Sequence, residues 1–429
     1  MKRYRFLAWI LVLMIVAGCA PAAVSEGRQM EQASLATATA APSTVTATAA
    51  PAASTPPPTL TAAPTRTPLP SASPAPPVFG PQSFPEGINP LTGLPVKDPQ
   101  TLTYPPALIS VTNWPLEARP QAGLSYAPFV FEVYIGEGST RYLALFYGDF
   151  PAAVTTGDAT ALGPVRSGRL VYEPLRKMFH GFLVMASAYS KVSENLSEFN
   201  NVFGSDTEDI NSAMVPVSKL EEIARASKYP IKPGFLYSYR FDSQPPAGGK
   251  NAPVLWLPYS YYNQIFWRYD AASAAYHRFQ DRADGKTFVE DTDRLNGQAL
   301  TYENVVVLFA EHTRYAETLI DINLEYIKRQ PALLFRDGKM YEIYWTTRSE
   351  SYERKTGLVR PLRFEDAQGN PVALHPGQTW VEVVPTFTPY YETVDADYLK
   401  MAKQKTPGSG IWAVLFYVPE LSEKKFTGK

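Results

Sequence analysis

Cysteine is nearly absent from this chain, because Cys19 is the single one among 429 residues. Internal disulfides and metal centres with several thiolate ligands are therefore excluded. Histidine is scarce too, and the four are widely separated: His180, His277, His312 and His375. None forms an HExxH or HxxxH pair, so we expect no metal site and no cofactor. Neither sign of charge dominates, since 40 basic residues stand against 41 acidic ones. The chain therefore has no excess of positive charge that would indicate nucleic acid as a partner.

The apolar run at the N-terminus is too short to cross a bilayer, which takes about 20 apolar residues. It covers Phe6 to Val16 and follows lysine and arginine residues within positions 2–5. This pattern is typical of a signal peptide. Small residues precede Cys19, as in a lipobox. In a lipobox the thiol receives a diacylglyceryl group, and cleavage then makes the cysteine the first residue of the mature protein. Residues 1–19 therefore predict lipid anchoring on the extracytoplasmic face of the cell membrane. A plain secretory signal with an accidental cysteine is the alternative.

Residues 20–87 contain few large apolar side chains, and up to about residue 80 they are nearly all Ala, Thr, Pro and Ser. Such a segment buries too little apolar surface to offset the entropy of ordering. We expect a disordered tether that acts as a spacer. Its serine and threonine content leaves O-glycosylation open.

Residues 88–242 combine strand and helix patterns. Four runs have strand composition: Ala107–Thr112, Phe129–Ile135, Arg141–Tyr147 and Gly181–Ala186. The second and third are joined by a loop of hairpin length, Gly136–Ser139. Apolar residues spaced at i, i+4 and i+7 between Val192 and Phe199 predict a helix. Ser218–Glu221 has the pattern of a capping box that opens another helix. Strands on both sides of helices predict an α/β domain.

Beyond a proline- and glycine-rich stretch at residues 243–250, the apolar pattern changes to period two. Ile320–Tyr326 alternates, and Asp337-Gly338 joins two alternating runs as a tight hairpin turn. "QTWVEVV" and "GIWAVLFYVP" have the composition of further strands. Residues 251–429 therefore predict a mainly antiparallel β domain. The aromatic stretch 255–270 could form a carbohydrate platform or a β core, and the ordinary strand preference of aromatic residues favours the core.

Acidic clusters give weaker hypotheses. The segment Asp291–Gly297, "DTDRLNG", is similar to a calcium loop, but its glycine comes one residue late and position 12 is Tyr302. An acidic turn between strands is the simpler interpretation. Asp206, Glu208 and Asp209 could hold a cation or act as acid and base, although a solvated loop is the ordinary arrangement.

Arginines form the main candidate constellation. Guanidinium groups suit phosphate, pyrophosphate and carboxylate, and the glycines of "GPVRSGR" allow close approach of the backbone to a ligand. We expect an anion pocket at strand ends with neutral donors beside the cations. The proposed contacts are Arg119, Arg141, Arg166 and Arg169, with Asn113, Gln121 and Ser167. The alternative is that these arginines pair with local acids such as Glu132, Glu137 and Glu173, or lie in water.

Longer motifs carry a family resemblance. "NPLTGLPV", "ARPQAGLSYAPFVFEVYIGEGSTRYLALFYG" and "LGPVRSGR" lie in the first half, and "NGQALTYENVVVLF", "ALLFRDGKMYEIYW" and "HPGQTWVEVVP" in the second. Over residues 88–385 the chain resembles the YerB-like bacterial lipoproteins, whose two paired domains have no known function. The resemblance implies an architecture and a location but no reaction. This chain has Met185–Ala188 where relatives carry a His-Ala-Gly-Gly run, and it lacks a later Pro-His-Asn pattern near Asn211-Ser212.

Three functions follow as hypotheses. The first is binding of an anionic envelope ligand, such as a phosphorylated wall polymer or glycolipid, through the arginines. The second is a transferase or hydrolase acting on wall polymers, since the order of strands and the arginine-rich turn is similar to the core of LytR–CpsA–Psr phosphotransferases. The third is a scaffold that binds an envelope protein through the β domain.

Overall fold

The computed structural model describes residues 77–151, 161–197, 199–201, 213–227, 230–400 and 405–428. The expected signal peptide with Cys19 and most of the expected tether lie outside these residues, as do Asp206, Glu208 and Asp209. Within the described ranges, none of the helices has both the length and the apolar composition needed to cross a membrane.

Strands outnumber helices throughout the described part of the chain. The strands of the first half are β1 (Ala107–Thr112), β2 (Phe129–Gly136), β3 (Ser139–Phe146), β4 (Ala161–Leu162), β5 (Phe182–Met185), β6 (Phe199–Asn201), β7 (Val215–Pro216) and β8 (Arg240–Phe241). The helices are α1 (Tyr172–Phe179), α2 (Ser190–Ser193), α3 (Val217–Arg225) and α4 (Glu350–Thr356).

In the described residues of the second half there are fifteen further strands. They are β9 (Lys250–Asn251), β10 (Val254–Ser260), β11 (Asn263–Asp270), β12 (Ala275–Asp281), β13 (Phe288–Glu290), β14 (Thr301–Tyr302), β15 (Asn304–Arg314), β16 (Ile320–Asn323), β17 (Gln330–Arg336), β18 (Lys339–Thr346), β19 (Arg363–Glu365), β20 (Ala373–Leu374), β21 (Thr379–Pro385), β22 (Tyr390–Glu392) and β23 (Ile411–Val414).

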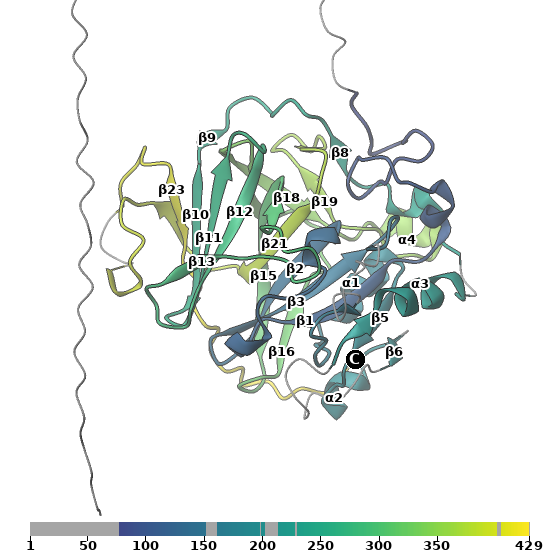
Figure 1. The fold of residues 1–429 in the computed structure, drawn as a ribbon, viewed down its shortest axis with the longest axis horizontal. Helices are drawn as coiled ribbons and strands as arrows, with labels where there is room; N and C mark the ends of the chain where they lie inside the picture. Colours follow the sequence, from purple (N-terminus) through teal and green to yellow (C-terminus); the bar gives the residue numbers. More distant parts are fainter. Residues whose placement is uncertain are drawn as a thin grey trace, which may run out of the picture. The chain divides into compact units, whose positions relative to one another are not determined.

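Two large sheets hold most of the described strands (Figure 1), while β8 pairs with β20 and β4 with β7 in two small two-stranded sheets. The larger has twelve strands in the order β19-β18-β17-β15-β21-β2-β3-β1-β5-β6, with β16 beside β15 and β9 beside β18. The smaller has seven strands in the order β13-β12-β11-β10-β23-β22, with β14 beside β12. Strands β1, β5 and β6 run parallel to one another, whereas β3 is antiparallel to β1 and β2.

The larger sheet is continuous across the expected domain boundary. Strand β2 of the first half pairs in parallel with β21 of the second half, and this register sets Glu132 opposite Glu382. Strand β21 also pairs in parallel with β15. The division of the chain at residues 243–250 remains a prediction, but the strands on its two sides share one sheet.

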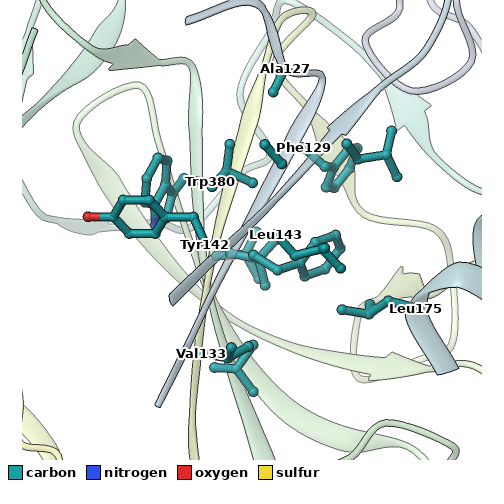
Figure 2. Close-up of a cluster of buried hydrophobic side chains, with 14 of the residues drawn as sticks. Ala127, Phe129, Val133, Tyr142, Leu143, Leu175 and Trp380 are labelled. Carbon is teal, nitrogen blue, oxygen red and sulfur yellow. The ribbon is translucent and has the colours of Figure 1, made fainter. Parts of the chain in front are cut away.

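Both faces of the central strands are covered, which explains their continuous apolar composition. All six residues of β1 are buried. Figure 2 shows Phe129 and Leu143 on the side of Leu175 from α1, whereas Tyr142 and Trp380 point to the other side. Phe179 of α1 contacts Phe129, with ring centroids 6.0 Å apart. The side opposite α1 faces the seven-stranded sheet, where the hydroxyl of Tyr142 donates to Gln280 of β12 at 3.3 Å.

Local turn chemistry is confirmed. The β17–β18 hairpin turns at Asp337-Gly338, whose φ angles are 52° and 68°. Glu137-Gly138 connects β2 and β3 in the same way, with φ angles of 52° and 74°. This turn is two residues long, and the flanking Gly136 and Ser139 belong to the strands. The aromatic stretch 255–270 forms β10 and β11, and Trp256 and Trp267 are buried as the core interpretation predicts.

Two helix predictions are wrong at their ends. The helix expected over Val192–Phe199 ends at Ser193, and Phe199 opens β6. Ser197 instead donates its N–H and hydroxyl to the carboxylate of Glu173 at 2.9 and 2.6 Å. Burial acts to raise the pKa of Glu173, but hydrogen bonds from Arg176 and Ser197 lower it to about 2. The hydrogen bonds of Ser197 to the Glu173 carboxylate and the pairing of β6 with β5 therefore end the helix, although the apolar spacing would allow it to continue.

The expected capping box at Ser218–Glu221 is also wrong. Helix α3 begins at Val217, one residue before the expected cap, and its N-cap is Pro216, which contributes no side-chain hydrogen bond. Val215–Pro216 pairs with β4 as strand β7, so tertiary pairing sets the helix start. The strand-rich character of the chain is confirmed. The α/β character of residues 88–242 is not confirmed, because the described helices there are few and short.

Candidate functional site

The arginine segment, residues 163–169, lies where the parallel strands β1 and β5 end. Thr112 of β1 donates its N–H to the carbonyl of Pro164 at 3.0 Å, and Arg166 donates its own to the carbonyl of Ser110 at 2.9 Å. On the other side, the N–H of Ala186, next to β5, donates to the carbonyl of Arg166 at 3.1 Å. The segment is therefore held between the two strand ends. The carboxyl ends of parallel strands are a common place for ligand sites.

Arg141 reaches this segment from β3. Its Nη1 donates to the carbonyl of Ser167 at 3.2 Å, and the hydroxyl of Ser110 donates to the same carbonyl at 3.1 Å. Ser110 also shares a hydrogen bond of 3.0 Å with the hydroxyl of Tyr172, at the start of α1. Burial raises the pKa of Tyr172, while the charges of Arg141 and Arg169 act to lower it. Both guanidinium groups therefore lie within electrostatic reach of the same tyrosine.

Arg166 and Arg169 complete the group. The backbone pairing of Val111 with Val165 puts Val165 on the side of the seven-stranded sheet, so the alternation of an extended chain directs Arg166 toward the α1 side. Arg166 is 6% exposed and Arg141 is 7% exposed. Nη1 of Arg169 donates to the carbonyl of Gly168 at 2.9 Å. Arg141, Arg166, Arg169 and Ser167 thus form one group, which we call the arginine site.

The other expected contacts lie elsewhere. Arg119 donates from Nε to the carbonyl of Asn113 at 3.2 Å and from Nη1 to that of Asp281 in β12 at 2.8 Å. The side chain of Asn113 donates to Thr140 at 2.7 Å, and that of Gln121 donates to the carbonyl of Thr112 at 3.0 Å. The expectation that all four arginines share one cavity is therefore corrected: Arg119 is held by the seven-stranded sheet, on the side opposite Arg141.

A buried polar centre fills the space between the two sheets. Arg278 of β12 donates from Nη2 to Glu132 of β2 at 2.8 Å and pairs through Nη1 with Asp291. Thr140 donates to Glu132 at 2.6 Å. Glu382 of β21 accepts from the hydroxyl of Tyr259 at 2.9 Å and from the indole of Trp267 at 3.0 Å. These bonds connect β2, β3 and β21 of the large sheet to β10, β11 and β12.

The charges of this polar centre are almost completely shielded from water. Glu132 and Glu382 are 0% exposed and Arg278 is 1% exposed, with its guanidinium 4.7 Å from the ring centre of Trp380. Burial raises the pKa of Glu132, although the charge of Arg278 opposes this. Burial, and then the charge of Glu132, raises the pKa of Glu382 to about 8. Glu382 is thus mainly protonated at neutral pH. Since no substrate could reach these carboxylates, the polar centre acts by joining the sheets.

The sequence carries a signal for this centre that our sequence interpretation did not use. Glu132 interrupts the apolar run "FVFEVYIG", and Glu382 interrupts "TWVEVVP". A charged residue inside a strand that is apolar on both faces must be buried, and a buried charge needs a partner. Arg278 at an inward position of "AYHRFQD" is such a partner.

The acidic loop Asp291–Gly297 contains a second buried anchor. Asp293 is 0% exposed, and its carboxylate accepts four hydrogen bonds. The donors are the N–H of Gly123 at 2.7 Å, the N–H and hydroxyl of Ser125 at 2.8 and 2.7 Å, and the N–H of Leu295 at 2.8 Å. Within the described ranges, no group of His, Cys, Asp and Glu side chains is arranged to hold a metal ion. This arrangement favours the acidic turn over the calcium loop.

Replacing Asp293 by alanine is expected to lower the free energy of unfolding by about 3 kcal/mol, because it leaves buried N–H donors of both halves without an acceptor. Urea unfolding of the full chain measures this loss. Asp284→Ala is the matched control, since Asp284 accepts N–H bonds from Lys286 and Thr287 at an exposed turn. We expect a smaller loss there. A stabilisation of the unaltered protein by added calcium would support the calcium loop instead.

Comparisons with known proteins agree with the two halves of the sequence. The family model described as "Protein of unknown function (DUF3048) N-terminal domain" matches residues 91–226, and the corresponding "C-terminal domain" matches residues 255–381. The Bacillus subtilis (strain 168) protein named "Putative lipoprotein YerB" is 26% identical over 312 residues, which cover 69% of this chain and 86% of the relative.

A solved structure extends this to the fold. The crystal structure of YerB from Bacillus subtilis matches with a TM-score of 0.52 at 22% identity, covering 69% of this chain and 96% of that chain. At this identity the likeness establishes a shared fold and no activity. Together with the two matched domains, it places the sheets described above in a known architecture. The chain belongs to the YerB-like family that these paired domains define.

Proposed function

We propose that this protein is an extracytoplasmic lipoprotein that binds the phosphate groups of an anionic envelope ligand at the arginine site. The ligand class includes a phosphate, a pyrophosphate or a phosphorylated glycan of a wall polymer or glycolipid. The observation that supports this most is the meeting of Arg141, from β3, with the segment that carries Arg166 and Arg169, at the carbonyl of Ser167. These residues are distant in sequence and converge at the ends of β1 and β5.

The chemistry of the site suits a multiply charged anion. Guanidinium groups bind phosphate oxygens in pairs, and several of them around one site neutralise more than one charge. The arginine segment comes just before α1, which has eight residues. The positive end of the helix dipole therefore adds to the positive charge of the site. Gly168 is packed so closely that an added Cβ would lie 2.5 Å from the sulfur of Met185. The backbone between the two arginines is therefore held in a fixed place.

The two carboxylates of the buried polar centre lie on the other side of the large sheet from the arginine site. Glu132 and Glu382 project to the side of the seven-stranded sheet, whereas Arg141 projects to the α1 side. They cannot serve as acid or base for a ligand at the arginine site. Catalysis by these two groups is therefore not part of the proposal.

The proposal includes the membrane anchor. The residues before Cys19 have the lipobox pattern, and the Bacillus subtilis relative carries "lipoprotein" in its name. A diacylglyceryl group on Cys19, with a further acyl chain such as palmitate on the new N-terminus, would supply more than one chain, which stable anchoring requires. The alanine- and proline-rich residues that follow would then carry the binding domain away from the membrane.

Pyrophosphate titrated into the full-length protein in detergent tests the site by isothermal calorimetry. We expect Arg166→Gln with Arg169→Gln to weaken binding at least about 100-fold, since each charge-assisted hydrogen bond contributes roughly 1.5–3 kcal/mol. Arg240→Gln is the matched control, because its side chain is 42% exposed and pairs with Asp242. That control should bind as the unaltered protein does.

Because Arg166 is buried, the single change Arg169→Gln accompanies the double change, and unfolding midpoints are compared for all variants. Equal affinity in the unaltered and doubly changed proteins would rule out the arginine site. An unaltered protein that does not bind pyrophosphate would rule it out equally.

A further inference from the structure

A cavity of about 290 Å³ lies between the loop that follows β1 and the strands β12 and β13, on the other side of the large sheet from the arginine site. Leu116, Arg119 and Pro120 line it from the loop. Arg282, Val289 and Asp291 line it from the seven-stranded sheet. Its walls therefore combine guanidinium groups with apolar side chains. A concave site with a few converging polar groups on apolar walls is typical of a small-molecule site.

Arg119 carries a donor that no described residue satisfies. Its Nε and Nη1 donate to the carbonyls of Asn113 and Asp281, which fixes the plane of the guanidinium. Its Nη2 is buried and has no hydrogen-bond partner among the residues that the structure describes. A buried donor without an acceptor is costly, and a guanidinium can only donate. Arg119 lines the adjoining cavity, so its guanidinium places positive charge beside a bound anion.

Arg282 provides a second cation at the cavity, and its side chain takes part in no ion pair of the described residues. The three acids that line the cavity are already engaged. Asp281 accepts the N–H of Gln264 at 2.9 Å, Asp291 pairs with Arg278, and Glu290 contacts Nδ1 of His277 at 2.6 Å. The exposed guanidinium of Arg282 therefore remains available to an acidic ligand, and Arg119 adds a second positive charge at the cavity wall.

We propose that this cavity binds a small sugar acid through its carboxylate, with Arg119 and Arg282 as the contacts. A carboxylate is planar and singly charged, so it matches a guanidinium fork. The three nearby carboxylates would repel a doubly charged phosphate more strongly than a monoanion. Leu116, Pro120 and Val289 offer apolar contact to one face of a sugar ring. The inference does not rest on the proposed function, because the two sites share no residue.

Glucuronate and glucose form a matched pair of probes, because they differ only in a carboxylate against a hydroxymethyl group. Titration of the full-length protein, followed by calorimetry, is expected to give a dissociation constant of about 1 mM for glucuronate. Glucose is expected to bind at least about tenfold more weakly, since it lacks the charge-assisted hydrogen bonds. Equal affinity for the two sugars, or no saturable binding of glucuronate, would overturn the proposal.

Variants locate the binding. Arg282→Gln changes an exposed side chain and is expected to weaken glucuronate binding about tenfold, and Arg119→Gln about 10- to 100-fold. Arg354→Gln is the matched control, because its side chain is 74% exposed on α4. Arg166→Gln with Arg169→Gln should leave glucuronate binding unchanged, which separates this cavity from the arginine site. Unchanged binding in both Arg119 and Arg282 variants would contradict the assignment.

Discussion

Replacing Arg278 by methionine is expected to lower the free energy of unfolding by about 3–5 kcal/mol. The change leaves Glu132 and Asp291 without the cation that both contact. Glu132 is 0% exposed, so water cannot solvate its charge in place of Arg278. The stacking of the guanidinium on Trp380 is lost as well. Denaturant unfolding of the full chain measures the effect.

The matched control is Arg268→Met on the neighbouring strand β11. Arg268 also stacks on an aromatic ring, 4.7 Å from the centre of Phe279, but its side chain is exposed. We expect this change to cost about 1 kcal/mol or less. If the Arg278→Met protein does not fold, Arg278→Lys keeps the charge and should show an intermediate loss. Equal stability of the Arg278→Met and Arg268→Met proteins would mean that the polar centre does not hold the sheets together.

The second large effect is a pH dependence that originates in Glu382. Its pKa is raised from the ordinary 4.5 to about 8, first by burial and then by the charge of Glu132. Between these two pH values the folded chain keeps a proton that the unfolded chain has released. The contribution of this group to stability is therefore complete below pH 4.5 and falls as the pH rises toward 8. Glutamine cannot titrate, so Glu382→Gln removes this loss of stability with rising pH.

Unfolding free energies of the unaltered and Glu382→Gln proteins, compared from pH 5 to pH 9, test this expectation. The difference should shift in favour of the variant by an amount on the order of 4 kcal/mol over that range. Glu342→Gln serves as the control, since Glu342 is 53% exposed on β18, and it should follow the unaltered protein. Parallel curves for the unaltered and Glu382→Gln proteins would show that Glu382 titrates normally.

Local features of the fold could be predicted from the sequence because they depend on adjacent residues. The strand Ala107–Thr112 has the predicted bounds, and Asp337-Gly338 turns the chain as expected. The predicted helix over Val192–Phe199 failed because the partner that ends it, Glu173, lies on α1. Periodicity describes which side of an element is apolar. It does not identify the distant group that interrupts the element.

The pairing of β2 with β21 could not be predicted from the residues of either strand. A strand buried on both faces shows the same apolar run whichever neighbour it takes. The sequence therefore indicated strands in both halves but not their common sheet. This pairing gives a physical reason for the two halves to occur in one chain, since each half contributes a glutamate and a strand to the same buried joint.

The candidate site was predicted in part for a similar reason. Arg166, Ser167 and Arg169 are neighbours in sequence, so any fold keeps them close. Arg141 joins them through the β1–β3 register, whereas Arg119 follows a loop that turns to the other side of the sheet. Residue type alone could not distinguish these two outcomes.

A structure of the protein determined with pyrophosphate would test the arginine site by locating the bound anion. We expect the anion at the ends of β1 and β5, in contact with the guanidinium groups of Arg166 and Arg169 and close to Arg141. Pyrophosphate absent from this place, or bound at another surface while the arginine site stays empty, would show that these arginines do not bind the ligand.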